Sequence, residues 1–402
     1  MKYCLLGEKL GHSYSKEIHA YCGLDYVLKE VTPCMVADFA FSNEFSGYNV
    51  TIPYKKTVMP YLDFISEDAK AVGAVNTVVI KGGKKHGHNT DVCGFIYSVK
   101  RIGVTLTDKT VMILGTGGAH NAVKRACEIE KAKEIISVGR NSTINYKNCY
   151  DITGVDVIVN ATPVGMYPNV FDSPIDLSRF KSLTAVIDLI YNPQKTKLLI
   201  QAEELGIKNT NGLSMLVEQA LCSQDLWLGK THDYSLTEEI ISKISKDKRN
   251  VCLVGMPSSG KSTVGKLLAE KLSKEFIDLD IEIEKTVGKT PSEIINERGE
   301  KAFREIETAV LKEVAIKSSK VIATGGGAII SKENREVIKQ NSISVYIKRD
   351  LSLLSVNGRP LSIAKGVETL YNERKDFYNL SDITVQNNGD INECLKEILN
   401  KL

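Results

Sequence analysis

The segment GMPSSGKST at residues 255–263 has the residue types and the spacing of a loop that binds nucleotide phosphates. It fits the pattern G-x-x-x-x-G-K-[ST] and lies between an apolar run and a helical pattern. The four fixed positions are Gly255, Gly260, Lys261 and Ser262. In such a loop, backbone N–H groups surround the phosphates, the lysine reaches the β- and γ-phosphate oxygens, and the hydroxyl binds Mg²⁺. The pattern predicts phosphoryl transfer from ATP, with Lys261 as a catalytic residue, Ser262 as a magnesium ligand and Thr263 as a further nucleotide contact.

Two carboxylates follow this loop in the segment FIDLDIEIE at 276–284. Asp278 falls at the predicted end of a strand, where a carboxylate can hold magnesium through water. Asp280, two residues further along an extended strand, would point the same way. Each could equally be an ordinary carboxylate at a strand end, so the pair alone does not identify the phosphoryl acceptor.

Four further segments complete an ordered set, namely EKAFREIE (300–307), ATGGGAI (323–329), NGRPL (357–361) and NERKDFY (372–378). Taken in this order, the segments of 250–402 resemble shikimate kinase. The resemblance implies that Asp280 orients the attacking hydroxyl and that Asp278 holds magnesium with Ser262. It further implies that Arg304 and Arg374 bind the substrate carboxylate, that backbone at Gly326 and Gly327 approaches the substrate ring, and that Arg359 closes over the phosphates. One departure is that 351–358 lacks the basic residues that the family often places near adenine.

A second glycine-rich loop, GTGGAH at 115–120, also lies between an apolar run and a helical pattern. The positions Gly115, Gly117, Gly118 and Ala119 approximate a dinucleotide fingerprint, although His120 stands where a third Gly or Ala is usual. The next strand ends in Gly139 and Arg140, with no acidic residue to bind a ribose 2′-hydroxyl. The loop therefore predicts a dinucleotide site, and Arg140 favours NADP(H).

Seven segments flank this second loop, namely GHSYSKEIH (11–19), NVTIPYK (49–55), GAVNTV (73–78), HNTDVCGF (88–95), NATPVGM (160–166), DLIYNP (188–193) and GLSMLVEQA (212–220). Together they resemble shikimate dehydrogenase, over about 1–245. The resemblance implies that Lys55 and Asp91 are the catalytic pair. It also implies that Ser13 and Ser15 bind the substrate carboxylate, that Thr51, Asn76 and Gln219 contact the ring hydroxyls, and that Tyr191 is a further substrate contact. The family often has an Asn at position 139 and another basic residue a few positions after Arg140, so use of NAD beside NADP stays open.

Short runs rich in Val and Ile alternate with amphipathic stretches, which is typical of α/β domains with mostly parallel sheets. The predicted strands cover 3–7, 110–115, 134–139, 156–162, 184–191, 250–255, 321–327 and 344–348, with a hairpin at 75–89 turning at Gly82-Gly83. A basic polar segment, 242–250, marks the predicted boundary after a helical run. We therefore expect a two-lobed dehydrogenase with a Rossmann-like nucleotide domain at 1–245, followed by a P-loop kinase domain with a parallel sheet at 250–402. The substrate lobe would comprise 1–100 and 213–245, and the NADP-binding lobe 101–212.

The composition is that of a soluble globular protein of 402 residues, with 43% hydrophobic and 25% charged residues and a formal net charge of +3. This balance does not favour nucleic acid or a membrane as a partner, so we expect small-molecule substrates. Nine scattered cysteines without a C-x-x-C pair, and an N-terminus without a signal-peptide pattern, favour the cytoplasm.

The two resemblances together predict a bifunctional enzyme of aromatic amino acid biosynthesis. One half would reduce 3-dehydroshikimate to shikimate with NADPH, and the other would phosphorylate the 3-hydroxyl of shikimate with MgATP. Two alternatives stay open. The first half could use quinate with NAD beside a kinase of another small polyol acid, or one half could be a non-catalytic binding or regulatory module.

Overall fold

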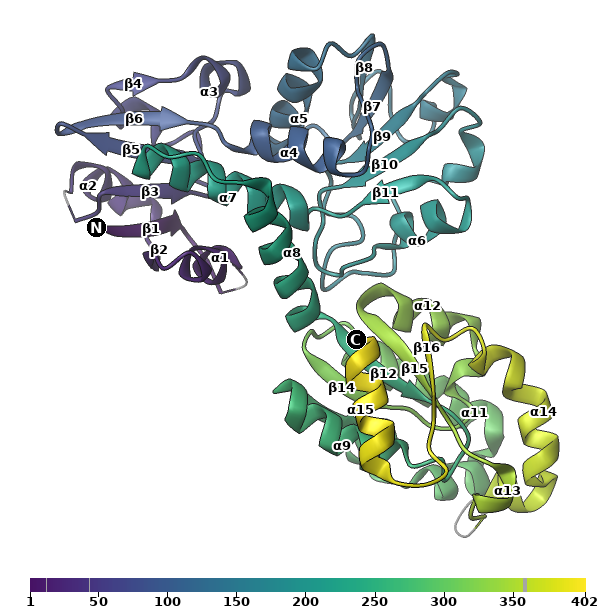
Figure 1. Cartoon of the computed structure of the whole chain (residues 1–402). Coiled ribbons are helices and arrows are strands. Elements are labelled where there is room, and N and C mark those ends of the chain that lie inside the picture. Colours follow the sequence, from purple (N-terminus) through teal and green to yellow (C-terminus); the bar gives the residue numbers. More distant parts are fainter. Residues whose placement is uncertain (12, 43, 357–359) are drawn as a thin grey trace. The chain divides into compact units, whose positions relative to one another are not determined.

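The computed structural model describes residues 1–402 apart from 12, 43 and 357–359. The chain divides into two compact units (Figure 1). The first comprises Met1–Met166, Phe171–Tyr191 and Gln201–Ile244, and the second comprises Tyr167–Val170, Asn192–Ile200 and Ser245–Leu402. Both units are α/β, as predicted from the alternation of apolar and amphipathic segments.

The first sheet of the first unit is mixed and has the strand order β2-β1-β3-β5-β6-β4. Its strands are β1 (Lys2–Gly7), β2 (Asp25–Glu30), β3 (Gly47–Val50), β4 (Phe64–Ile65), β5 (Thr77–Lys81) and β6 (Lys84–His88), with helices α1 (Ser15–Tyr21), α2 (Val36–Phe41) and α3 (Glu67–Val72). β1 runs parallel to β2 and β3, whereas β5 runs antiparallel to β3 and β6. The turn between β5 and β6 has positive φ at Gly82 and Gly83 (58° and 76°), which confirms the predicted hairpin.

The second sheet of this unit is fully parallel and has the order β11-β10-β9-β7-β8. Its strands are β7 (Thr110–Leu114), β8 (Glu134–Val138), β9 (Val157–Asn160), β10 (Ala185–Asp188) and β11 (Lys208–Thr210), with helices α4 (Asp91–Arg101), α5 (Gly118–Ile129), α6 (Lys197–Glu204) and α7 (Leu213–Leu228). α4 and α7 pack closely because Gly94 has no side chain: a Cβ there would lie 2.6 Å from the carbonyl oxygen of Met215.

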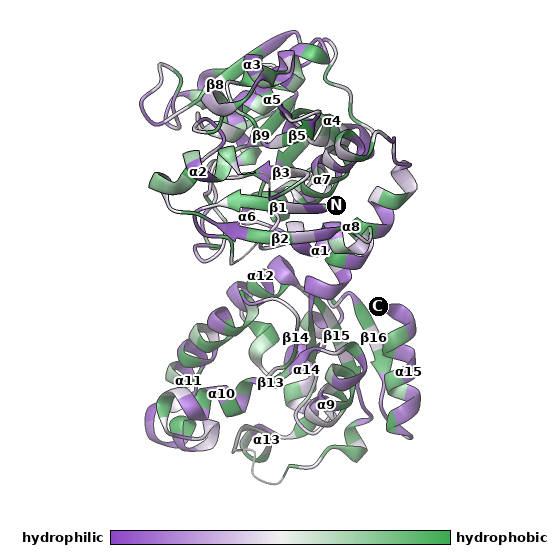
Figure 2. Ribbon diagram, turned by 90° about the vertical axis from the view of Figure 1, so that its left-hand side faces the viewer, coloured by the Kyte–Doolittle hydropathy of each residue, from purple (hydrophilic) through white to green (hydrophobic). Residues whose placement is uncertain are grey.

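The sheet of the second unit is also fully parallel, in the order β13-β14-β12-β15-β16. Its strands are β12 (Asn250–Val254), β13 (Glu275–Asp278), β14 (Lys320–Ala323), β15 (Ser342–Lys348) and β16 (Ile383–Gln386). Its helices are α9 (Lys261–Leu272), α10 (Leu279–Val287), α11 (Pro291–Ala315), α12 (Lys332–Asn341), α13 (Pro360–Lys365), α14 (Val367–Tyr378) and α15 (Ile391–Lys401). Hydrophobic residues concentrate on the strands and on the helix faces that cover them (Figure 2).

The eight strands predicted from Val- and Ile-rich runs are all present, most of them slightly shorter than predicted. Two local predictions were wrong. The basic segment 242–250 was predicted to follow a helix. It is itself largely helical, since α8 (Tyr234–Lys248) includes most of it. Asp280 does not lie on an extended strand: the Asp278 side chain caps a helix that begins at Leu279, so Asp280 lies in its first turn.

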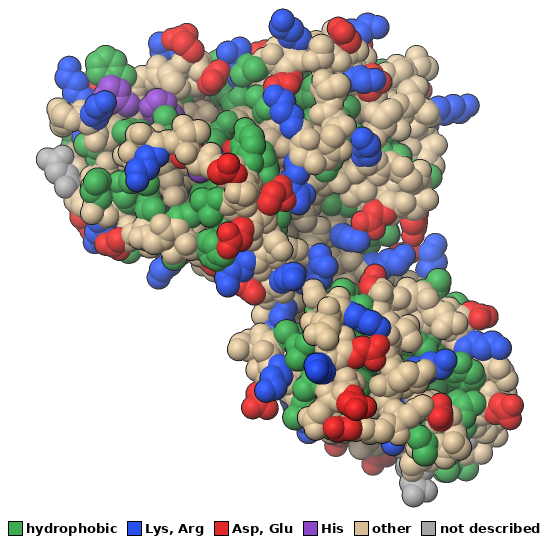
Figure 3. Space-filling view, viewed as in Figure 1, with side chains coloured by type: hydrophobic (Ala, Val, Ile, Leu, Met, Phe, Trp, Pro, Cys, Tyr) green, Lys and Arg blue, Asp and Glu red, His purple; other side chains and the backbone are tan. Residues whose placement is uncertain are grey.

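Lys, Arg, Asp and Glu side chains are interspersed over the visible face of each unit (Figure 3). Within the described part of the chain, no helix combines the length and the apolar run that a membrane crossing needs. All nine cysteines are free thiols.

Candidate active sites

The first unit contains a cavity of about 820 Å³ that brings together residues from distant parts of the sequence. Nine predicted site residues line it, namely Ser13, Ser15, Thr51, Lys55, Asn76, Asp91, Ala119, Tyr191 and Gln219. They come from the segment before α1 and the first residue of α1, the loop after β3, the residue before β5, the N-termini of α4 and α5, the segment after β10, and α7. The cavity thus joins groups of the first sheet to the glycine loop of the second.

Lys55 and Asp91 form an ion pair in this cavity, with Nζ 2.6 Å from Oδ2. Their side chains are 28% and 15% exposed, so both are partly shielded yet open to a ligand. Asp91 is the first residue of α4, where the helix dipole favours a negative charge. Its backbone N–H donates to Oδ1 of Asn89. The pair places an ammonium donor and a carboxylate at one point of the cavity wall.

Asn76 connects this ion pair to Gln219 of α7. Its Nδ2 donates to Oδ1 of Asp91 at 2.9 Å and lies 3.4 Å from Oε1 of Gln219, while its Oδ1 accepts from the backbone N–H of Thr90. Asn76 is buried, so these bonds are shielded from water. The amide therefore fixes the orientation of the Asp91 carboxylate.

A second buried network supports the floor of the cavity and was not predicted from the sequence. Asn49, which lines the cavity, donates to Ser223 at 2.9 Å and accepts from Tyr26 at 2.8 Å. His19 contacts Asn49 Oδ1 at 3.2 Å, and burial lowers the pKa of His19 to about 3, so its ring is neutral. Asn49 lies inside the segment 49–55, but its burial is a tertiary property that the motif alone does not reveal.

The glycine loop of the second sheet has the open backbone that a dinucleotide needs. Gly115 has φ of 100°, and a Cβ there would lie 2.9 Å from the Thr162 side chain, so this tight turn requires glycine. Gly117 precedes α5 and Gly118 begins it, and a Cβ at either would meet no atom within 4 Å. The N-terminus of α5 is therefore accessible to a pyrophosphate. Arg140 is exposed one residue beyond Gly139, after the end of β8, and does not line the cavity of this unit.

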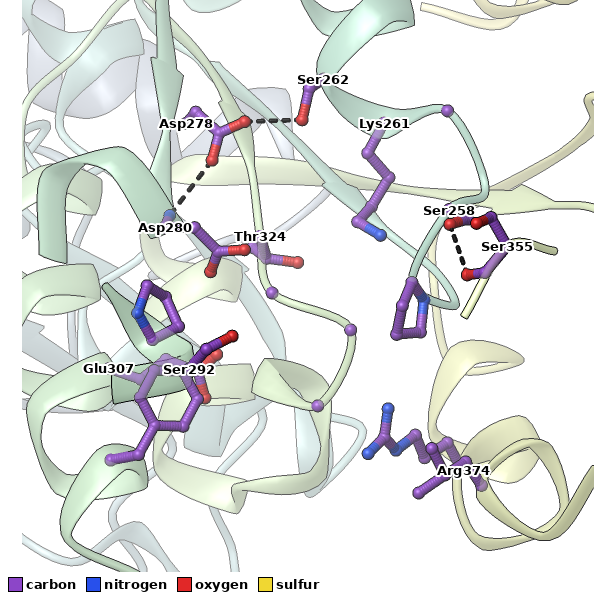
Figure 4. Close-up of a pocket in the computed structure, with 18 of the residues that line it drawn as sticks. Ser258, Lys261, Ser262, Asp278, Asp280, Ser292, Glu307, Thr324, Ser355 and Arg374 are labelled. Atoms are coloured by element: carbon purple, nitrogen blue, oxygen red, sulfur yellow. Dashed lines mark hydrogen bonds between the residues drawn. The ribbon is translucent and has the colours of Figure 1, made fainter. Parts of the chain in front are cut away.

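The second unit has a cavity of about 840 Å³ around the predicted phosphate loop. Gly255 and Gly260 have φ of 147° and 95°, a backbone that residues with side chains rarely adopt. Lys261 folds over this loop and donates to the carbonyl oxygens of Gly255 and Met256, each at 2.9 Å. Ser262 donates to Oδ2 of Asp278 at 2.6 Å (Figure 4). A hydroxyl and a carboxylate thus meet where the sequence predicted magnesium, and the loop fits a nucleotide.

Asp280 lines the same cavity from α10. The residue was therefore predicted to be near the site although its secondary structure was predicted wrongly. Its Oδ1 would lie 3.3 Å from a Cβ at Gly325. The next residue, Gly326, packs so closely on Pro257 of the phosphate loop that a Cβ would lie 2.6 Å from the proline ring. The glycine segment therefore lies beside the phosphate loop and beside the carboxylate of Asp280.

Two guanidinium groups line the part of this cavity assigned to the acceptor. Arg304 Nη1 donates to Glu307 at 2.7 Å and Nη2 to Glu300 at 3.1 Å. Arg374 is almost fully buried, and its Nε has no hydrogen-bond partner among the described residues. A carboxylate ligand would provide the missing acceptor and charge.

Glu307 also belongs to this site, although sequence reasoning did not identify it. It is fully buried, and desolvation raises its pKa against the lowering effect of Arg304. One of its oxygens, Oε1, has no partner among the described residues. The sequence did contain a signal for Glu307: it follows Arg304 by three residues on α11, and residues with this spacing lie on one helix face. The predicted lid residue Arg359 lies outside the described residues.

Comparison with known proteins gives a family match for each of the two units that hold these cavities. Residues 5–78 match the shikimate dehydrogenase substrate binding domain, and residues 257–402 match shikimate kinase. The NADP(+) shikimate dehydrogenase of Clostridium perfringens is 36% identical over 262 residues, which cover 60% of this chain and 97% of that protein. The chain belongs to the shikimate dehydrogenase family. Its C-terminal part is a shikimate kinase domain.

Two solved structures extend the comparison for the dehydrogenase part. A chorismate mutase/shikimate 5-dehydrogenase fusion protein from Clostridium acetobutylicum is 38% identical with a TM-score of 0.58, covering 61% of this chain and 97% of that chain. Shikimate 5-dehydrogenase from Thermus thermophilus, in complex with NADP(H) and shikimate, is 29% identical with a TM-score of 0.55, covering 60% of this chain and 99% of that chain. With the kinase match, these relatives support a bifunctional enzyme of the shikimate pathway.

Proposed function

We propose that this chain carries out two consecutive reactions, each in its own unit. The first unit reduces 3-dehydroshikimate to shikimate with NADPH, and the second phosphorylates the 3-hydroxyl of shikimate with MgATP. The observation that carries the proposal is that each unit holds one cavity where the residues of its motif set meet, around Lys55–Asp91 in the first unit and around Lys261 and Asp280 in the second.

In the reduction, Lys55 is the proton donor. When bound, the reduced nicotinamide supplies the hydride to the carbonyl carbon, which leaves a developing negative charge on the carbonyl oxygen. The Lys55 ammonium, held 2.6 Å from Asp91, stabilises this charge and transfers a proton to the oxygen. Asp91 and Asn76 keep the lysine oriented toward the cavity.

The remaining polar groups of this cavity would position the substrate. Ser13 and Ser15 lie at the start of α1, where Ser13 Oγ accepts from the Ser15 backbone N–H at 3.2 Å, and their hydroxyls would bind the substrate carboxylate. Thr51, Asn76 and Gln219 would bind ring hydroxyls, and Tyr191 would cover the ring. Several weak bonds to one rigid ring hold the carbonyl beside Lys55, which lowers the entropy cost of the reaction.

In the phosphoryl transfer, the protein positions the hydroxyl and neutralises charge. MgATP supplies the phosphoryl group; Ser262 and Asp278 would hold the magnesium, and Lys261 would turn from the loop carbonyls to the phosphates. Asp280 orients the attacking hydroxyl and accepts its hydrogen bond. Arg304 and Arg374 bind the substrate carboxylate from two elements, α11 and α14.

Several finer assignments belong to the same proposal. Arg140 would contact the 2′-phosphate of NADP(H), beside a pyrophosphate at Gly115, Gly117, Gly118 and Ala119. The lobes would be 1–100 with 213–245 for substrate and 101–212 for NADP, followed by the kinase at 250–402. The nine free thiols support a cytoplasmic protein.

A coupled assay on the purified full chain tests the proposal. We expect NADPH oxidation that depends on 3-dehydroshikimate, and ATP consumption that depends on shikimate and yields shikimate 3-phosphate. Comparison of quinate with shikimate and of NAD⁺ with NADP⁺ tests the alternative substrates. Reduction without any shikimate-dependent ATP consumption would remove the kinase half of the proposal.

A further inference from the structure

The side chain of Arg349 lines the nucleotide cavity of the second unit and forms no hydrogen bond or ion pair with the described residues. Arg349 follows β15 directly and lies beside the phosphate loop: its Nη1 is 3.9 Å from the position that a Cβ at Gly260 would occupy. Its Nε is buried and has no hydrogen-bond partner among the described residues. A buried donor of this kind is uncommon in native proteins.

The backbone on both sides of Arg349 is held in place by the loop after β16. The Asn387 N–H donates to the carbonyl oxygen of Lys348 at 2.8 Å, and the Asp350 N–H donates to Oδ1 of Asn388 at 2.9 Å. The buried Asn387 side chain also donates to the carbonyl oxygen of Ser259, within the phosphate loop, at 2.7 Å. One short segment therefore fixes Arg349 and the phosphate loop with respect to each other.

The charge of Arg349 is not neutralised by any residue in the part of the chain that the structure describes. No carboxylate of the described residues forms an ion pair with its guanidinium. An uncompensated, partly buried cation is unfavourable, and its cost falls when an anionic ligand binds. Lys261, the cation of the phosphate loop, donates to two loop carbonyls, whereas no described residue accepts a hydrogen bond from the Arg349 side chain.

We propose that Arg349 donates hydrogen bonds to phosphate oxygens of the nucleotide bound at the 255–262 loop. The guanidinium fork suits phosphate oxygens and is always charged. This role gives the nucleotide a basic contact that residues 351–358 do not provide, because they contain no Lys or Arg. The inference rests on the kinase activity proposed above and adds a nucleotide-binding residue to it.

Kinetics of R349Q and R349K in the full chain test this role. R349Q should raise the KM for ATP, and the dissociation constant of ADP measured by calorimetry, by about tenfold or more, the usual loss for a charged hydrogen bond. The KM for shikimate should stay within about twofold because the acceptor residues are elsewhere. K348Q is the matched control: it removes one positive charge at the adjacent residue, which does not line the cavity, and should leave the KM for ATP unchanged.

Three outcomes would overturn the inference. The KM for ATP of R349Q could equal that of the wild type, or K348Q could raise it as much as R349Q does, which would indicate a general charge effect. R349Q could also lose shikimate binding, and R349K, which keeps the positive charge, then separates the explanations. If the KM of R349K for ATP equals that of the wild type, a contact through the guanidinium fork is contradicted. Absence of kinase activity in the wild-type chain would instead refute the proposed function, so the two failures are distinguishable.

Discussion

The ammonium of Lys55 lies 2.6 Å from one oxygen of Asp91, and the other oxygen of that carboxylate accepts a hydrogen bond from Asn76 at 2.9 Å. The two carboxylate oxygens therefore have separate partners. Lys55 follows β3 and Asp91 begins α4, so the first sheet and this helix together determine the geometry.

Lys55→Met should lower the dehydrogenase kcat by about 10²- to 10⁴-fold, because it removes the proton donor and keeps the aliphatic stem. The kinase activity of the same chain should remain close to wild type and serves as an internal control. Lys56→Met is the matched control for Lys55→Met, since Lys56 is exposed and does not line the cavity. Loss of both activities in Lys55→Met would show that the two sites are not independent.

Gly327→Ala should impair the kinase by displacing Arg304, because an alanine Cβ would overlap its guanidinium. The side chain can move aside, so the free energy of unfolding should change little while the KM for shikimate rises by about tenfold or more. Gly389→Ala is the control, since a Cβ there meets no atom within 4 Å. An unchanged KM for shikimate in Gly327→Ala would contradict the assigned role of Arg304.

Glu307→Gln tests whether a buried carboxylate positions Arg304. The change removes the charged partner 2.7 Å from Nη1, so we expect the KM for shikimate to rise by about tenfold and the KM for ATP to change little. Glu305→Gln alters an exposed residue of the same helix and should have no effect. A rise in the KM for ATP instead would place Glu307 on the nucleotide side of the cavity.

The sequence was sufficient to predict most of the fold because buried parallel strands are continuous apolar runs. β12 and β15, with NVCLV and SVYIK, are of this kind. Strands such as β4 and β11 have two and three residues and lack such a run, so they were not predicted. The prediction of extended backbone at Asp280 was wrong because Asp278 caps a helix and so ends the strand. The capping hydrogen bond is local, and apolar patterning does not encode it.

Motifs in the sequence led to residues that line both cavities, but not to residues whose role depends on burial. Asn49 and Glu307 lie inside the motif segments 49–55 and 300–307, yet only the structure shows that Asn49 is buried against Ser223 and Glu307 against Arg304. Arg349 lies in no motif, and its missing partner is a property of the folded chain.

Arg140→Ser tests the choice of nicotinamide cofactor. If Arg140 contacts the 2′-phosphate, the KM for NADPH should rise by about tenfold or more while the KM for NADH changes little, since NADH lacks this group. Lys133→Ser removes a positive charge just before the start of the same strand, β8, and should leave both constants unchanged. Equal increases for the two cofactors would refute a contact with the 2′-phosphate.

His232 lies between two carboxylates where α7 is followed by α8. Its Nε2 is 3.1 Å from Glu218 and its Nδ1 is 2.8 Å from Asp225, and its side chain is only 10% exposed. Glu218 also accepts from Thr237 at 2.8 Å. The hydrogen bond to Glu218, with a further contribution from Asp225, raises the pKa of His232 to about 9. The folded state therefore binds this proton more tightly than the unfolded chain, in which the pKa is about 6.5.

His232→Gln should consequently have a pH-dependent effect on stability. The stabilisation by the charged histidine is complete below about pH 6.5 and is lost as the pH rises through about 9, because the unfolded chain releases the proton first. The difference in free energy of unfolding between wild type and variant should thus shrink by up to about 3 kcal/mol from pH 6 to pH 10. Urea titrations followed by the fluorescence of Trp227, the only tryptophan and a residue of α7, report on this unit. His86→Gln is the control variant, because it removes a histidine that stacks on Phe64 and has no carboxylate partner among the described residues. A difference for His232→Gln that stays constant over this range would mean that the histidine is neutral between its two carboxylates.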